Sequence, residues 1–227
     1  MGINDYERTA DFHNWSKKMK NNYRIMCAII AWVVLSLRFV DMLIIGEQSS
    51  IAETLFIYFG YFTVWANILI ALAFTAPLLK ADSKLFNFFM RPAVRTALAS
   101  YIFMVSVVYH MLIVPYWNPQ GFTWVTATGL NTVMPILYII DWLFFAEKRL
   151  IFYKHLPYWL IFPAVYGVTS IIRGLLTNVY PYPFLNVTDL GIGNVLFNML
   201  GLVAVFAVVG PIFIVLAHLI SDKLKTK

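Results

Sequence analysis

A few ionisable and amide side chains are embedded in long apolar stretches of this sequence, where polar groups need a specific reason to occur. Arg38 and Asp41 are three residues apart, and Thr63 and Asn67 are four apart, so each pair shares one face of a helix. His110 lies in a third apolar stretch. Paired charges neutralise each other, hydroxyl and amide groups bind polar ligands, and imidazole transfers protons near neutral pH. Such groups indicate either a polar site or hydrogen bonds between helices.

The composition places these residues in a membrane protein. Of the 227 residues, 61% are hydrophobic and 12% are charged, and the mean hydropathy is +0.74. A soluble domain carries roughly 25% charged residues, so the soluble and disordered classes are excluded. The single cysteine, Cys27, excludes an internal disulfide and a cysteine-rich zinc site.

Six stretches are long enough and apolar enough to cross a bilayer as helices, which takes about 20 residues each. We predict an all-α, polytopic membrane protein with six transmembrane helices. The domains are a cytoplasmic or interfacial segment over residues 1–23, a transmembrane domain over 24–219 and a cytoplasmic tail over 220–227. The predicted spans are Arg24 to Ile45, Ala52 to Leu79, Thr96 to Val114, Ala127 to Phe145, Leu156 to Leu176 and Ile192 to Leu219.

The basic residues predict how these helices are oriented. All but two of the 17 Lys and Arg residues flank the spans on one side; the exceptions, Arg38 and Arg173, lie within or at the end of a span. Cytoplasmic flanks are enriched in Lys and Arg, so both termini are predicted to be cytoplasmic, in a plasma membrane of bacterial type. The net charge of +6 therefore favours membrane lipids as partners and does not indicate nucleic-acid binding. The oligomeric state is not predicted.

The embedded polar residues are predicted to lie at similar depths. With a rise of 1.5 Å per residue, Arg38, His110 and Asn131 lie roughly 6–10 Å from the outer ends of their spans, and Thr63 roughly 15 Å. We therefore predict a polar pocket in the outer half of the membrane that suits an amphiphile. Separate hydrogen bonds between helices are the structural alternative. The predicted ligand-binding residues are Arg38, Asp41, Asn67, Asn194 and Asn198.

Several motifs resemble those of a bacterial six-span family sometimes called Pr-six-Pr. They are Tyr61-Phe62-Thr63 with Asn67, Val108-Tyr109-His110, Pro135 followed by Asp141-Trp142-Leu143-Phe144-Phe145, Arg173-Gly174, and Tyr180-Pro181-Tyr182-Pro183-Phe184-Leu185. The resemblance covers nearly the whole chain. The family is remotely similar to the eukaryotic androgen-induced and androgen-dependent membrane hydrolases, which cleave fatty acid esters of hydroxy fatty acids.

The resemblance implies an intramembrane threonine nucleophile and a histidine on another helix. Thr63 matches the nucleophile position. The bacterial relatives carry a histidine four residues before the proline of span four, where this sequence has Asn131. An amide can orient a hydroxyl or donate to an oxyanion, but it cannot accept and return a proton near neutral pH. His110, at a similar predicted depth, is the alternative base for Thr63.

Three functions remain open on the sequence. The first is a threonine-dependent lipid ester hydrolase that acts on a fatty acid ester, with Thr63, His110 and Asn131 as catalytic residues and no metal or cofactor. The second is a non-catalytic lipid-binding or membrane-organising protein. The third is a small-solute transporter, although the sequence has no visible repeats. Neither a Gly-x-Ser-x-Gly motif nor a His-Glu-x-x-His motif is present.

Overall fold

The structure is a computed structural model that describes residues 3–46, 50–79 and 83–225, with the side chains of residues 17–222 in these ranges. All regular elements of this part of the chain are helical, as predicted. The α-helices are α1 (Ile3–Ile45), α2 (Ile51–Tyr58), α3 (Phe62–Thr75), α4 (Lys84–Phe89), α5 (Pro92–Val108), α6 (Gly121–Thr128), α7 (Met134–Phe145), α8 (Leu156–Thr177) and α9 (Val187–Lys225). Short 3-10 or π segments are η1 (Ala76–Leu78), η2 (Tyr109–Ile113), η3 (Gly129–Val133), η4 (Tyr153–His155) and η5 (Pro183–Leu185).

Five helical segments of the described chain are long enough and apolar enough to cross a membrane. They are Lys17–Ile45, Pro92–Ile113, Gly121–Phe145, Tyr153–Thr177 and Val187–Asp222. The count becomes six if Ile51–Tyr58 and Phe62–Leu78, which are bent by 80°, form one span. Many apolar side chains on these helices are exposed, Phe144 by 75% and Leu176 by 80%, as expected for helices that face lipid.

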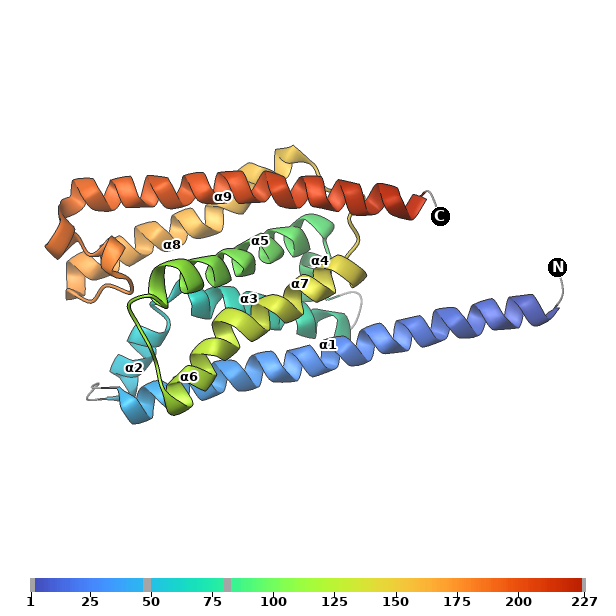
Figure 1. Ribbon diagram of the computed structural model, residues 1–227, viewed down its shortest axis with the longest axis horizontal. Coiled ribbons are helices and arrows are strands. Elements are labelled where there is room, and N and C mark those ends of the chain that lie inside the picture. The colour runs from blue at the N-terminus through green and yellow to red at the C-terminus, as the bar shows by residue number, and fades with distance from the viewer. Residues whose placement is uncertain (1–2, 47–49, 80–82, 226–227) are drawn as a thin grey trace.

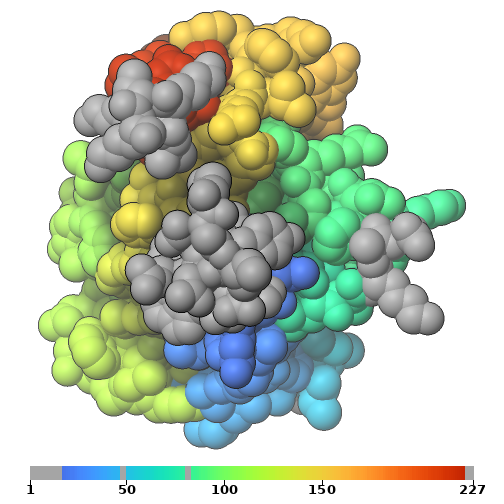
Figure 2. Space-filling model, turned by 90° about the vertical axis from the view of Figure 1, so that its right-hand side faces the viewer, coloured from blue at the N-terminus to red at the C-terminus, as the bar shows by residue number. Residues whose placement is uncertain are grey.

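The helices form an elongated bundle around a core that is centred on α3 and α5 (Figure 1). α3 packs against α1 and α5, α5 also contacts α7 and α9, and α8 lies along α9. Phe74, Ile102 and Trp142 are buried in this core. The first turn of α1 and the last turns of α9 lie at the same end of the bundle, and Figure 2 shows this end, with α9 in red.

The first helix is longer than the predicted first span. It is continuous from Ile3 to Ile45 and includes most of the predicted N-terminal segment, residues 1–23. Its N-terminal part extends beyond the bundle (Figure 1). Five of the basic residues that predicted the orientation have side chains outside the described part; they are Arg8, Lys80, Lys223, Lys225 and Lys227.

The second predicted span is not one straight helix, because α2 and α3 meet at an angle of 80°. The end of a helix leaves backbone carbonyl groups without hydrogen-bond donors. At the end of α2, side chains donate to these carbonyls. The Trp65 indole N–H donates to the Phe59 carbonyl at 2.8 Å, and the Tyr166 hydroxyl donates to the Gly60 carbonyl at 2.7 Å. The bend therefore places Thr63 in the first turn of a helix instead of the middle of a span.

Two of the apolar helices contain a widened π turn, in which a backbone N–H donates to the carbonyl five residues earlier. These turns are η2 and η3. Such turns are rare and are often found at functional sites. η2 contains His110 and η3 contains Asn131, so two of the predicted site residues lie in irregular turns of neighbouring helices.

Candidate functional site: two cavities that meet at Thr63

Thr63 lies where two cavities adjoin. We call one the polar cavity, because Arg38 and Asn131 are in its lining, and the other the apolar cavity. The polar cavity has a volume of about 230 Å³ and the apolar one about 70 Å³. Thr63, Ile113 and Tyr182 line both of them. Three separate elements, α3, η2 and the connection between α8 and α9, therefore form the boundary between the two cavities.

One charged residue and several aromatic rings line the polar cavity. Arg38 lines it, and its Nη1 donates to Asp41 Oδ2 at 2.5 Å. Asp41 is buried and also accepts hydrogen bonds from the hydroxyls of Thr123 at 2.9 Å and Thr126 at 3.0 Å. The Arg38 guanidinium lies 6.0 Å from the centre of the Trp117 ring. Asp41 thus holds Arg38 in place, and Arg38 is the charged group that lines the cavity.

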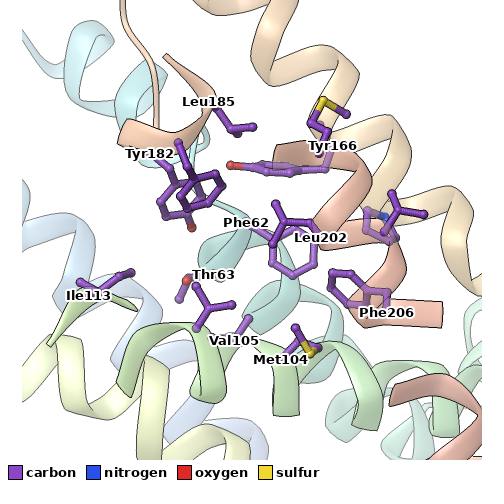
Figure 3. A pocket seen from close by; sticks show the side chains of 16 residues that line it. Phe62, Thr63, Met104, Val105, Ile113, Tyr166, Tyr182, Leu185, Leu202 and Phe206 are labelled. Atoms are coloured by element: carbon purple, nitrogen blue, oxygen red, sulfur yellow. The ribbon is translucent and has the colours of Figure 1, made fainter. Parts of the chain in front are cut away.

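The Thr63 side chain faces two hydrogen-bonding partners. Its Oγ1 donates to Asn131 Oδ1 at 3.4 Å. On the other side, Tyr182 points its hydroxyl towards Thr63 (Figure 3). Burial raises the pKa of Tyr182 to about 12, although hydrogen bonding with the Thr63 side chain and backbone acts in the opposite direction. Tyr182 therefore stays protonated at neutral pH and can donate a hydrogen bond.

The π turn explains how Asn67 becomes part of this structure. Because Met134 donates to the Gly129 carbonyl and Pro135 has no N–H, the Leu130 carbonyl lacks a partner within its helix. Asn67 Nδ2 donates to this carbonyl at 3.1 Å. Asn67 is fully buried and links α3 to η3 behind the cavity wall, so its contacts are those of a positioning residue.

His110 makes its hydrogen bond away from Thr63. The His110 Nε2 atom lies 3.0 Å from the Thr132 hydroxyl, and the His110 side chain is exposed. This bond joins η2 to η3, next to Asn131. Among the hydrogen bonds of the described residues, none joins His110 to Thr63, which contacts Asn131 instead.

The two asparagines predicted on span six lie outside both cavities. Asn194 Nδ2 donates to the Leu190 carbonyl within α9, at 2.8 Å, and its side chain is exposed. Asn198 Nδ2 donates to the Phe184 carbonyl at 2.9 Å. Asn198 therefore holds the loop that carries Tyr182, while Phe184 itself lines the apolar cavity.

Neither Tyr182 nor Trp117 is among the residues predicted for the site. Both lie outside the predicted spans, where exposed loops are the ordinary expectation. A signal was present for Tyr182, because it stands between Pro181 and Pro183 in the loop before the predicted span that begins at Ile192. A proline-restricted loop of this kind holds its side chains in few orientations.

The arrangement can bind a ligand with a polar head and an apolar tail. Arg38 and Asn131 supply a cation and an amide on one side of Thr63, and apolar side chains line the cavity on the other side. Activation of a hydroxyl needs a neighbouring base, and neither Asn131 nor protonated Tyr182 is one. No group of three or more metal-ligating His, Cys, Asp or Glu side chains occurs among the described residues.

No protein-family model, curated protein or solved structure matches the chain.

Proposed function

We propose that the protein is a membrane protein that binds an amphiphilic lipid carrying a carboxylate or an ester group. The polar group lies beside Arg38 and Asn131, and the acyl chain passes Thr63 into the apolar cavity. The observation that carries the proposal is the shared boundary of the two cavities at Thr63, Ile113 and Tyr182. The apolar cavity is narrow, and the flexible side chains of its lining methionines make room for the chain.

We also propose that the bent pair α2 and α3 is one span, so that six spans leave both termini in the cytoplasm of a bacterial-type cell. The beginning of α1 and the end of α9 lie at one end of the bundle, which supports an even number of spans. Arg24 and Arg95 both contact Asp141, and Lys148 follows α7 at this same end. Basic residues favour the cytoplasmic side. On this view the cavities at Thr63 belong to the outer half of the membrane.

Binding is tested with a fluorescent fatty acid whose emission rises in apolar surroundings, added to the purified protein in detergent. Leu202 lines the apolar cavity, so Leu202→Phe fills it and should weaken binding about tenfold, which is about 1.4 kcal/mol. Leu200→Phe is the matched control, because Leu200 lies on the same helix and is 69% exposed. Arg38→Met should weaken the binding of a fatty acid more than the binding of its methyl ester, because the ester carries no negative charge. Equal binding by all four proteins would contradict the proposal.

Ester hydrolysis at Thr63 is a second candidate, and one observation favours it. Thr63 lies in the first turn of α3, where the positive end of the helix dipole stabilises negative charge on a reacting oxygen. An ester at the boundary between head and tail would lie next to this hydroxyl. A base must still reach Thr63, either His110 after a rearrangement or a group supplied by the ligand.

Hydrolysis is tested with a fluorophosphonate probe and a long-chain ester substrate. Thr63→Ala should abolish labelling and turnover, and Thr63→Ser should retain part of both. His110→Ala should abolish turnover only if His110 is the base. Equal labelling of wild type and Thr63→Ala would refute the hydrolase, and the lipid-binding proposal would stand on its separate test.

A further inference from the structure

A third hollow, which we call the lateral groove, shares Tyr166 with the lining of the apolar cavity. It has a volume of about 650 Å³ and runs between the α2–α3 bend and α8. Its lining is mostly apolar, with Phe56, Phe59 and Trp65 on one wall and Ile172 and Leu176 on the other. All five are between 40% and 80% exposed, so the groove is open to the surroundings of the bundle.

One cation, Arg173, lines this groove. The centre of its guanidinium lies 3.8 Å from the centre of the Phe56 ring, and its Nη1 packs against Gly60 so closely that a Cβ at that position would overlap it. The Arg173 Nε atom is buried without a hydrogen-bond partner, and no ion pair among the described residues includes Arg173. Phe56 and Gly60 thus hold in place a guanidinium whose charge the described chain does not neutralise.

The position of Arg173 along α8 indicates the depth of this charge. Arg173 is four residues before the end of α8 at Thr177, which corresponds to roughly 6 Å along the helix axis. At that depth the guanidinium lies close to the level of lipid headgroups, whereas the groove continues into the apolar layer. A charge held among apolar side chains favours a partner of opposite sign, and the apolar walls of the groove favour hydrocarbon.

We propose that the lateral groove binds one phospholipid molecule, with the phosphodiester on Arg173 and the acyl chains along α8. A guanidinium forms two parallel hydrogen bonds with phosphate oxygens. The preferred lipid carries a net negative charge, because a zwitterionic headgroup places its own cation beside the phosphate. This site is separate from the cavities at Thr63, and neither proposal depends on the other.

The test is native mass spectrometry of the detergent-purified full chain, titrated separately with phosphatidylglycerol, phosphatidylcholine and diacylglycerol. Wild type should retain phosphatidylglycerol best. Arg173→Gln should weaken its retention about tenfold, and Arg173→Lys should weaken it less, because a lysine keeps the charge but loses the planar fork. Arg149→Gln is the charge control, since Arg149 is 64% exposed and lies in the loop after α7.

A second pair of variants tests the groove without changing its charge. Thr169 lines the groove, so Thr169→Trp should block it and lower retention of all three lipids. Val168→Trp, at a neighbouring exposed position outside the lining, should leave retention unchanged. Equal retention of phosphatidylglycerol and diacylglycerol by wild type, or unchanged retention by both Arg173→Gln and Thr169→Trp, would overturn the proposal. Fatty acid binding at the Thr63 cavities should be normal in all these variants.

Discussion

Asp141 shows how one residue can hold three helices together. Its side chain is fully buried, and its two oxygens accept hydrogen bonds from Arg24 Nε, at 2.8 Å, and from Arg95 Nη2. α1, α5 and α7 therefore meet at one carboxylate. Arg24 Nη2 and Arg95 Nε are buried without partners, so the two guanidinium groups depend on Asp141 for compensation. Two arginines that the sequence assigned to membrane flanks thus have a structural role.

Removing this carboxylate should destabilise the protein strongly. We expect Asp141→Asn to lower the free energy of unfolding by about 3–5 kcal/mol, because two buried cations would lose their counter-ion. The measurement is thermal unfolding of the detergent-solubilised protein. Glu147→Gln is the control, since Glu147 is 58% exposed and its pairing with Arg149 at 3.9 Å contributes little. Equal melting temperatures for the two variants would contradict this account.

Among the elements, the connection between α8 and α9 depends on a glycine contact. The Tyr180 ring packs so closely on Gly174 that a Cβ there would overlap the ring. This contact fixes the beginning of the loop in which Tyr182 lies beside Thr63. α8 ends at Thr177, and the next residue, Asn178, adopts a left-handed conformation with φ of 56°.

We therefore expect Gly174→Ala to destabilise the protein by about 1–3 kcal/mol, because the ring must move to admit the methyl group. It should also weaken fatty acid binding, since Tyr182 would shift from the cavity boundary. Gly201→Ala is the matched control, because among the described residues its added Cβ would meet no side chain or other helix within 4 Å. Alanine in a helix is more stable than glycine by about 0.5–1 kcal/mol. If Gly174→Ala is as stable as Gly201→Ala, the packing argument fails.

At the scale of the whole molecule, the proposed topology places the connection between η2 and α6 outside the cell. The loop after α7 lies at the opposite end of the bundle, with the two termini (Figure 1). Asn118 and Arg149 are exposed in these two loops. Cys27, the single cysteine, is buried, so single-cysteine variants can be built in a Cys27→Ala background.

In intact cells, a membrane-impermeant maleimide should label Asn118→Cys and not Arg149→Cys. After the cells are opened, both variants should be labelled to the same extent. The reverse pattern would invert the proposed orientation. Labelling of both variants in intact cells would place the two loops on one side, which is incompatible with six spans.

The sequence predicted the helices better than it predicted the site. Hydropathy and span length predicted an all-helical chain with six apolar spans. The described chain has five such segments, or six if the bent pair α2 and α3 is one span. The bend at Gly60 was not predicted, and the side chains that contact it are distant in the sequence: Arg173 packs against Gly60, and the Tyr166 hydroxyl donates to the Gly60 carbonyl. Of the predicted site residues, the structure brings Thr63, Asn131 and Arg38 together at one cavity.

The sequence by itself determined the helical class and the predominance of apolar helices, because both follow from composition and from local spacing. Only the tertiary structure decided the partner of each polar side chain. Thr63 and Asn131 are 68 positions apart and Asp41 and Thr123 are 82 apart. A hydrogen bond in an apolar surrounding forms with whichever group the packing brings within reach. Local sequence carries no information about that choice, so the cavities at Thr63 emerged only when the helices were packed.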